Sequence, residues 1–139
     1  MTLVKDLMTK DVRVCFPTDT IFKAAEIMAV NDLGLLVVVD DDPRFIPRGI
    51  ITDTDILKRI VLKEKNPKLT LVQDIMTKSM TSISSDETAT NAAQKMFQYR
   101  VKRLPVVDDK RLVGIISHKD LLETFVNYKK KLLDLALEF

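Results

Sequence analysis

Two short segments of this sequence end in the same arrangement of a hydroxyl residue and an aspartate. They read Gly-Ile-Ile-Thr-Asp-Thr-Asp at residues 49–55 and Gly-Ile-Ile-Ser-His-Lys-Asp at residues 114–120. The β-branched pair predicts the end of a buried strand that passes directly into a helix. The hydroxyl residue and the aspartate then occupy the N-cap and N3 positions of that helix. A helix N-terminus that follows a strand is a common binding place for small anionic ligands.

The same spacing also has a purely structural explanation. Ser or Thr followed three residues later by an acidic residue is close to a capping box, in which the two side chains satisfy free backbone N–H groups. One copy by itself would favour capping without further function. Two copies in matching surroundings favour a ligand-binding role as well.

The composition limits the classes of function. The 139 residues suit one large domain or two small ones, and 46% apolar and 30% charged residues suit a packed core with a soluble surface. A net charge of +2 gives no argument for a nucleic-acid or membrane partner. The longest apolar runs, such as 33–39, are far shorter than the ~20 residues of a membrane span. The N-terminus has no signal-peptide layout.

Catalytic and metal-binding residue sets are not evident. The single cysteine, Cys15, excludes an internal disulfide, and together with the single histidine, His118, it cannot build a zinc cluster. Catalysis would require a nucleophile–base pair, a metal cluster or an acid–base couple. We therefore expect no enzyme activity, no catalytic residue and no metal, and the cysteine usage favours a reduced, cytoplasmic location.

The two segments belong to a longer internal repeat. Val-Lys-Asp-Leu-Met-Thr-Lys at 4–10 recurs as Val-Gln-Asp-Ile-Met-Thr-Lys at 72–78, 68 positions later, and the same offset aligns 38–41 with 106–109. The offset then falls to 65, because the first copy has three extra residues in its turn-rich segment 42–48. A single copy of about sixty residues buries too little surface to be stable alone, so the two copies should pack together.

Each copy predicts a short amphipathic turn followed by β-α-β-β-α. The turns lie at 4–8 and 72–76, and the strands at 12–16, 35–39 and 48–52 and at 80–84, 104–107 and 112–117. Thr20 and Thr88 are predicted to cap the first helices, whose apolar stripes comprise Ala24, Ala25, Ile27 and Met28 or Ala92, Ala93, Met96 and Phe97. The last helices carry Ile56, Leu57, Ile60 and Val61 or Leu121, Leu122, Phe125 and Val126, and the second is expected to continue into the tail.

In these features the chain resembles the cystathionine-β-synthase (CBS) domain family in its tandem form, the Bateman module. The matching residues are Asp-Leu-Met-Thr at 6–9, Asp-Ile-Met-Thr at 74–77, Leu-Pro-Val-Val-Asp at 104–108 and the two Gly-Ile-Ile segments, and the resemblance covers residues 3 to about 127. It implies an α/β fold of two β-α-β-β-α CBS domains packed about a pseudo-twofold axis. The expected boundaries are 1–65 and 71–127, with a linker at 63–70 and a helical tail at 128–139.

The resemblance also implies a ligand and its contacts. Such modules bind AMP, ADP, ATP, S-adenosylmethionine or related adenosyl molecules as regulatory ligands in the clefts between the domains, and no cofactor is obligatory. By position, Asp55 and Asp120 would accept hydrogen bonds from the ribose hydroxyls. Further ribose and phosphate contacts would come from Thr52, Thr54, Ser117, His118 and Lys119, phosphate contacts from Lys102 and Arg103, and the adenine pocket from Cys15, Phe16, Pro17, Ser82 and Ile83.

The first copy departs from this pattern. Gly34 and Leu35 stand where the second copy has Lys102 and Arg103, so at most one strong phosphate clamp is evident, unless Arg44, Arg48, His118 or Lys119 contributes to it. We expect two unequal sites, or one occupied and one vestigial. The structural alternatives are that Lys102 and Arg103 form a solvated helix end, that His118 is an exposed N1 residue and that Cys15 is an inert apolar side chain.

The sequence therefore favours a stand-alone regulatory module that binds an adenosyl ligand, forms a homodimer and signals to an unknown effector protein. The alternative is an assembly module with degenerate sites. Its support is the tail beyond the repeat, where Leu132, Leu135, Leu137 and Phe139 would need cover from a partner. Nucleic-acid binding through the lysines at 129–131 and the pair at 102–103 is a weaker option, because a three-lysine run is ordinarily a solvated helix face.

Overall fold

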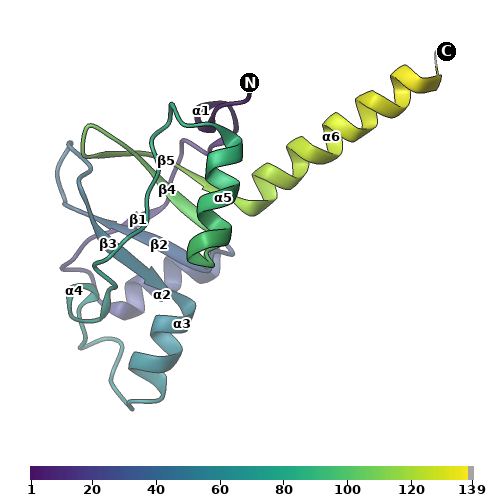
Figure 1. Ribbon diagram of the computed structural model, residues 1–139. Coiled ribbons are helices and arrows are strands. Elements are labelled where there is room, and N and C mark those ends of the chain that lie inside the picture. The colour runs from purple at the N-terminus through teal and green to yellow at the C-terminus, as the bar shows by residue number, and fades with distance from the viewer. Residues whose placement is uncertain (138–139) are drawn as a thin grey trace. The chain divides into compact units, whose positions relative to one another are not determined.

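The computed structural model describes residues 1–137 (Figure 1). The chain forms two compact units, and neither is continuous in sequence. Unit 1 consists of Met1–Lys10, Thr81–Asp108 and Val113–Phe139, and unit 2 consists of Asp11–Met80 and Asp109–Leu112. No helix within residues 1–137 has the length and apolar character needed to cross a membrane.

Unit 2 is built on a three-stranded sheet in the order β1-β2-β3. The strands are β1 (Val14–Cys15), β2 (Leu35–Val39) and β3 (Pro47–Thr52); β1 is parallel to β2, and β2 is antiparallel to β3. The helices are α2 (Ile21–Val30), α3 (Asp53–Ile56), the π-helical turn η1 (Leu57–Val61) and α4 (Val72–Ile75). Buried side chains from the sheet and all these helical segments except α3 form one core: Cys15, Ile21, Ala24, Met28, Leu36, Val38, Ile51, Ile60, Val72 and Ile75.

Unit 1 has the corresponding elements of the second repeat. Strands β4 (Arg103–Asp108) and β5 (Arg111–Ser117) form a two-stranded sheet, and Ile83 adds a single parallel bridge to Val106. The helices are α1 (Val4–Leu7), α5 (Ala89–Tyr99) and α6 (His118–Leu137). The core consists of Val4, Ile83, Ala92, Met96, Leu104, Val106 and Ile116.

The segment that begins each repeat completes the unit formed by the other repeat. In unit 1, Val4 N donates to Glu87 O at 2.8 Å; in unit 2, the equivalent Val72 N donates to Asp19 O, also at 2.8 Å. Thr9 bridges Ile115, and Thr77 bridges Ile50 in the same way. The two bridges have the same backbone geometry, because N–H groups and carbonyls are exchanged in both directions at 2.9–3.0 Å. The repeated Met-Thr motif is therefore a strand-like addition to the sheet edge of the opposite repeat.

This addition explains the glycine in each Gly-Ile-Ile segment. A Cβ atom at Gly49 would lie 2.5 Å from the carbonyl oxygen of Thr77. A Cβ atom at Gly114 would lie 2.7 Å from the sulfur of Met8 and 2.9 Å from the carbonyl oxygen of Thr9. Neither glycine has a positive φ, so close approach of the added segment is the reason for the residue type. The two repeated motifs, far apart in sequence, are thus one structural feature.

Most of the predicted α/β elements are confirmed. Thr20 and Thr88 cap α2 and α5, accepting hydrogen bonds from Lys23 N at 3.1 Å and from Asn91 N at 3.0 Å. The first strand of each repeat is shorter than predicted: β1 has two residues, and its counterpart in the second repeat is the bridge at Ile83.

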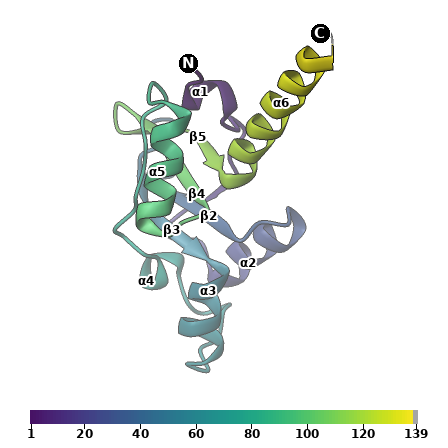
Figure 2. The same ribbon diagram turned by 45° about the vertical axis from the view of Figure 1, so that its right-hand side comes forward.

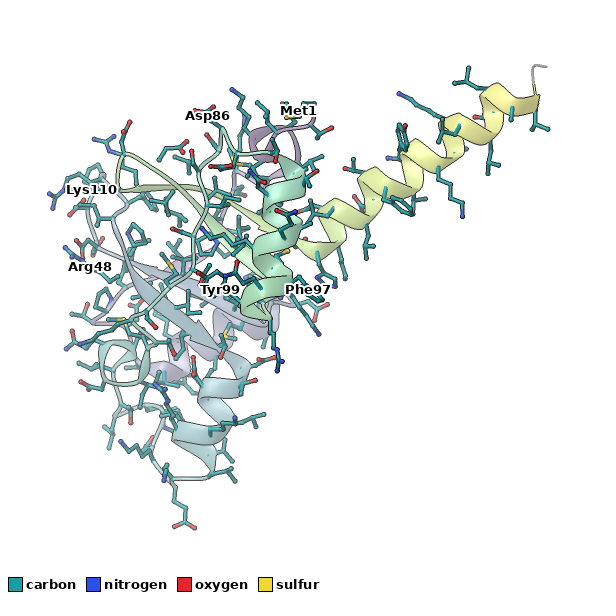
Figure 3. The ribbon with its side chains drawn as sticks, in the orientation of Figure 1. Met1, Arg48, Asp86, Phe97, Tyr99 and Lys110 are labelled. Atoms are coloured by element: carbon teal, nitrogen blue, oxygen red, sulfur yellow. The ribbon has the colours of Figure 1, made fainter. Side chains whose placement is uncertain are left out.

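The predicted apolar stripe of α5 was partly wrong. Ala92 and Met96 are buried, whereas Phe97, labelled in Figure 3, is 89% exposed. Consecutive residues of a helix point about 100° apart, so the face that buries Met96 leaves its neighbour outside. The helix after β3 was also predicted as one α-helix, but it passes into the π-helical turn η1, which buries Ile60 and leaves Leu57 and Val61 each 57% exposed.

Helix α6 continues to Leu137, which confirms its predicted extension into the tail. Leu121 packs against the core of unit 1, whereas Leu122, Phe125 and Val126 are each more than half exposed. Phe139, which the sequence analysis counted with the apolar tail, lies outside the described residues.

Substituting Gly49 tests the close approach of the Thr77 backbone to the sheet edge. Gly49→Ala should lower the free energy of unfolding in urea by roughly 1–3 kcal/mol, because the new methyl group meets backbone rather than a movable side chain. Gly114→Ala should cost less, because the backbone oxygen of Thr9 lies 2.9 Å from the new methyl group rather than 2.5 Å, and the nearer atom belongs to the flexible side chain of Met8. Wild-type stability in Gly49→Ala would show that the Thr77 carbonyl does not constrain this position.

Candidate ligand-binding edges

Both Ser/Thr-x-x-Asp segments form capping boxes. Asp55 N donates to Thr52 Oγ1 at 3.0 Å, and Thr52 N donates to Asp55 Oδ2 at 3.1 Å. In unit 1, Ser117 N donates to Asp120 Oδ2 at 2.8 Å, and Asp120 N donates to Ser117 Oγ at 3.3 Å. The structural explanation of the spacing is therefore correct in both repeats.

Capping uses only one oxygen of each carboxylate. Within residues 1–137, every side-chain hydrogen bond accepted by Asp55 or Asp120 goes to Oδ2. Both residues are half-buried, so Oδ1 is not sealed in the interior. An ionised carboxylate has about four acceptor positions, and Oδ1 can therefore accept from a ligand while Oδ2 caps the helix. Capping and ligand binding do not exclude each other here.

In unit 1 the backbone of Lys102 contacts the start of the helix that carries Asp120. His118 N, in the first turn of α6, donates to the carbonyl of Lys102 at 2.8 Å, which ties the start of β4 to the helix N-terminus. Lys102 is exposed and Arg103, the first residue of β4, is half-buried. The alternative that Lys102 and Arg103 form a solvated helix end is wrong, because neither residue lies in a helix and Arg103 is half-buried. The helix α5 has already ended, with Arg100 in the left-handed region at φ 55°.

His118 and Lys119 take different positions. The Nδ1 atom of His118 lies 3.4 Å from the Lys102 carbonyl oxygen, so the ring remains at the edge between β4 and α6, and the residue is only half exposed. Lys119 is exposed and lines a separate groove of about 390 Å³ along α6, with Leu122, Glu123, Val126 and Asn127. The structure therefore groups Ser117, His118 and Asp120 with the Lys102 backbone, and places Lys119 on a different face.

Unit 2 repeats the backbone geometry without the charge. Asp53 N donates to the Gly34 carbonyl at 3.0 Å, as His118 N does to Lys102. Gly34 and Leu35 supply no cation at this edge. Thr54 is exposed beside Asp55.

The arginines of the first repeat are paired with carboxylates. Arg48 contacts Asp40 through Nη2 at 2.6 Å and Nε at 2.8 Å, and Arg44 pairs with Asp42 at 2.9 Å. Hydrogen bonds from these guanidinium groups lower the pKa values of Asp40 and Asp42. Both carboxyls therefore stay ionised over a wider acid range, and both arginine forks are already occupied.

The predicted adenine-pocket residues of unit 2 fall into two groups. Cys15 is 1% exposed within the core, and burial raises the pKa of its thiol to about 12. Its side chain fills the interior and is not presented to solvent. Phe16 and Pro17 are half-buried, and Pro17 lines a groove of about 570 Å³ with Asp40, Arg48, Gln73, Asp74, Met76 and Lys78.

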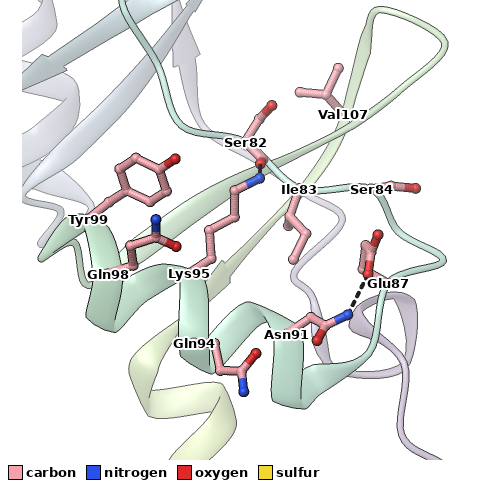
Figure 4. Close-up of a pocket in the computed structure, with 10 residues that line it drawn as sticks. All are labelled: Ser82, Ile83, Ser84, Glu87, Asn91, Gln94, Lys95, Gln98, Tyr99 and Val107. Atoms are coloured by element: carbon pink, nitrogen blue, oxygen red, sulfur yellow. Dashed lines mark hydrogen bonds between the residues drawn. The ribbon is translucent and has the colours of Figure 1, made fainter.

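In unit 1, Ser82 and Ile83 line a polar groove of about 430 Å³ against one face of α5 (Figure 4). The Ser82 carbonyl accepts from Lys95 Nζ at 2.6 Å, and Glu87 accepts from the Asn91 side-chain amide at 2.8 Å. Sequence reasoning did not identify this groove. Its signal was the spacing of Asn91, Gln94, Lys95 and Gln98, which places amide and amine groups on one helix face.

A second hydrogen-bond network fixes the edge of this groove. Asp108 accepts from Ser84 Oγ at 3.1 Å, from Ser85 N at 3.0 Å and from the Ser85 hydroxyl. The Ser85 contacts hold the pKa of the Asp108 carboxyl below its usual range. Within residues 1–137, no group of three or more His, Cys, Asp and Glu side chains is arranged to hold a metal ion.

Comparison with known proteins identifies relatives along nearly the whole chain. The model of the family described as "CBS domain" matches residues 4–62 and 72–127. The uncharacterized protein YlbB of Bacillus subtilis is 34% identical over 122 residues, covering 87% of this chain and 80% of YlbB. The chain spans less than two thirds of several other relatives, so the paired segment also occurs within longer proteins.

Two solved structures are similar in fold and were determined with ligands. CBSX2 in complex with AMP has a TM-score of 0.81 at 26% identity, covering 93% of this chain and 99% of that one. The CBS domain pair of MJ0100, in complex with 5'-methylthioadenosine and S-adenosyl-L-methionine, has a TM-score of 0.79 at 32% identity, with 92% and 98% coverage.

Thiol labelling tests the interior position of Cys15. A thiol with a pKa near 12 has roughly a thousandfold less thiolate at pH 8 than an ordinary cysteine, and burial also blocks the reagent. We expect Ellman's reagent to react with native protein at least a hundredfold more slowly than with protein in urea. Rapid labelling of the native protein would place the thiol at the surface, where a ligand could touch it.

Proposed function

Since the chain belongs to the CBS domain family and carries two such domains, we propose that it is a regulatory module that binds an adenosyl ligand and signals this binding to an effector protein. The stronger site is at the edge of unit 1 formed by Ser117, Asp120, Lys102 and Arg103. Binding alone is sufficient for this role, because a ligand shifts a conformational equilibrium by its different affinities for two arrangements. We assign no reaction to the chain.

The observation that carries this proposal is the partial use of the Asp120 carboxylate. Its Oδ2 atom caps α6, and no side-chain or backbone donor within residues 1–137 occupies Oδ1. The cap holds the carboxylate in a fixed orientation, so an acceptor for a vicinal diol is already in place before the ligand arrives. Ribose hydroxyls are donors of this kind.

The neighbouring charges supply the second part of the recognition. Lys102 precedes β4 and Arg103 begins it, where the His118 N–H donates to the Lys102 carbonyl, so phosphate oxygens near the N-terminus of α6 would meet the cationic side chains of both residues. The first repeat has the carboxylate of Asp55 but neither cation. We propose that this edge of unit 2 is weaker for phosphorylated ligands.

The choice of an adenosyl ligand is supported by the relatives solved with AMP and with S-adenosyl-L-methionine. We place the base near Ser82, which is half-buried at the groove beside α5. Phe16 and Pro17 are the corresponding candidates in unit 2. Cys15 in unit 2 and Ile83 in unit 1 would support these residues from behind without touching the base, because both side chains are buried in the cores of their units.

Substituting Asp120 tests the ribose contact. Asp120→Asn keeps a carbonyl oxygen that can cap α6 but turns the other acceptor into a donor, so the fold should persist while affinity falls about 10- to 100-fold. The measurement is thermal stabilisation by AMP, ADP, ATP, S-adenosylmethionine and NAD. A ligand at a hundred times its dissociation constant adds about 2.7 kcal/mol, or several degrees.

The matched control is Asp55→Asn, the same change at the equivalent position of unit 2. It should affect the stabilisation by phosphorylated ligands less than Asp120→Asn does. Full ligand-induced stabilisation of Asp120→Asn, or no stabilisation of wild-type protein by any of these compounds at millimolar concentration, would contradict the proposed function.

The basic pair can be tested by comparing ligands with and without phosphate. Lys102→Ala combined with Arg103→Ala should lower the affinity for AMP and ATP at least tenfold, because charge-assisted contacts to phosphate are lost. Binding of 5'-methylthioadenosine, which has no phosphate, should change little. Lys129→Ala with Lys130→Ala, an equal loss of charge on α6, is the control. An equal loss of affinity for ligands with and without phosphate would show that the basic pair does not contact the phosphate.

A further inference from the structure

Helix α6 carries a row of large side chains at a regular spacing that the ligand-binding proposal does not use. Leu121, Phe125, Tyr128, Leu132 and Leu135 follow one another at intervals of 4, 3, 4 and 3 residues. This is the a/d spacing of a coiled coil, with Phe125 and Leu132 at a and the others at d. The average of 3.5 residues keeps the row on one side of the helix over its whole length.

One end of this row is anchored and the rest is exposed. Leu121 packs against the core of unit 1, whereas Phe125 and Tyr128 are 62% and 61% exposed, and Leu132 and Leu135 are 49% and 52% exposed. In both views α6 leads away from the other elements of unit 1 (Figures 1 and 2). The anchored first turns stabilise the helix, and its outer turns then present a continuous apolar row.

The charges on α6 do not suit a membrane surface. Away from the row, α6 carries the carboxylates of Asp120, Glu123 and Asp134 and the ammonium group of Lys130, together with the exposed apolar side chains of Val126 and Leu133, so both signs of charge are present there. Helices that lie on anionic membranes have a polar face rich in lysine and arginine. A 3.5-residue apolar row with charges of both signs outside it is instead characteristic of helices that pair with helices.

We infer that this row of α6 pairs with the same row of a second copy of the chain, as a parallel coiled coil. The orientation follows from the lysines that flank the row. Lys129 lies at an e position and Lys131 at a g position. In a parallel pair, each g residue meets the e residue five positions later in the other helix, so Lys131 lies opposite Ala136 and Lys129 opposite Thr124. In an antiparallel pair, e faces e and g faces g, which brings like charges together.

Because Leu121 packs against the core of unit 1, the free row spans residues 125–135, and the seam is about 16 Å long at 1.5 Å per residue. A seam of about one and a half heptads gives a weak dimer by itself. The experiment therefore measures the proximity of two helices directly rather than the molecular mass alone.

The probe is a cysteine at a d position, Leu135→Cys, in the full chain. A parallel pair in register brings the two cysteines within disulfide distance, whereas an antiparallel pair with residue 135 opposite residue 125 separates them by about 15 Å. After mild oxidation and quenching with N-ethylmaleimide, we expect a disulfide-linked dimer on a non-reducing gel. Cys15 stays in place, because its buried thiol is unreactive.

Two adjacent leucines provide the matched pair of variants. Leu132→Glu, in the row, should reduce the Leu135→Cys cross-link at least tenfold, and Leu133→Glu, one residue outside it and 57% exposed, should leave it unchanged. Sedimentation should show the same difference at a protein concentration high enough for the weak dimer to form. Helix content measured by circular dichroism should be equal in the two variants, because the substitution is the same.

Three results would overturn the inference. The first is the absence of a cross-linked dimer in Leu135→Cys. The second is an equal reduction of this cross-link by Leu132→Glu and by Leu133→Glu. The third is a disulfide that forms only between Leu135→Cys and Phe125→Cys chains, which would show an antiparallel pair. Co-sedimentation with phosphatidylserine vesicles that both glutamate variants abolish equally would identify a membrane-binding helix instead.

Discussion

The backbone crossing at the two glycines is the contact on which each unit depends. Thr77 pairs with Ile50 through two hydrogen bonds of 2.9 Å, and the Thr77 carbonyl passes where a Cβ of residue 49 would stand. Thr9 and Ile115 make the equivalent contact in the other unit. Because the pairing segment comes from the opposite repeat, neither repeat completes its own sheet edge. Folding of the two repeats is therefore expected to be cooperative, since each unit requires residues from both.

Strand β5, against which the Met8–Thr9 segment packs at Gly114, leads directly into the capped helix α6. Gly114 and Ser117 are three residues apart on β5, so the segment that holds the strand in place also fixes where α6 begins. The helix N-terminus then orients Asp120 through Oδ2 and leaves Oδ1 for another donor. In the proposed function, helix capping and ribose recognition share this carboxylate, because Oδ2 caps α6 and Oδ1 remains for the ligand.

The repeats keep the shared backbone and differ in side chains at the edges. Gly34 and Lys102 both offer a carbonyl to the first turn of the following helix, yet only the second brings a cation. The first repeat has its arginines elsewhere, already paired with Asp40 and Asp42. Beyond the repeats, α6 adds an apolar row that belongs to neither edge.

The sequence by itself determined the elements, the repeat and the family, because strand and helix periodicity, N-cap residues and glycine positions are local signals. Thr20, Thr88 and the two capping boxes are local contacts over three residues, so spacing was enough to predict them. Only the tertiary structure decided that the Met-Thr segment of each repeat completes the unit formed by the other repeat. It also decided that Cys15 is buried while Phe97 is exposed, and that Arg48 forms an ion pair with Asp40. These features depend on contacts between residues distant in sequence, and on which face of an element meets a core. Periodicity cannot specify either, because it describes an element without its neighbours.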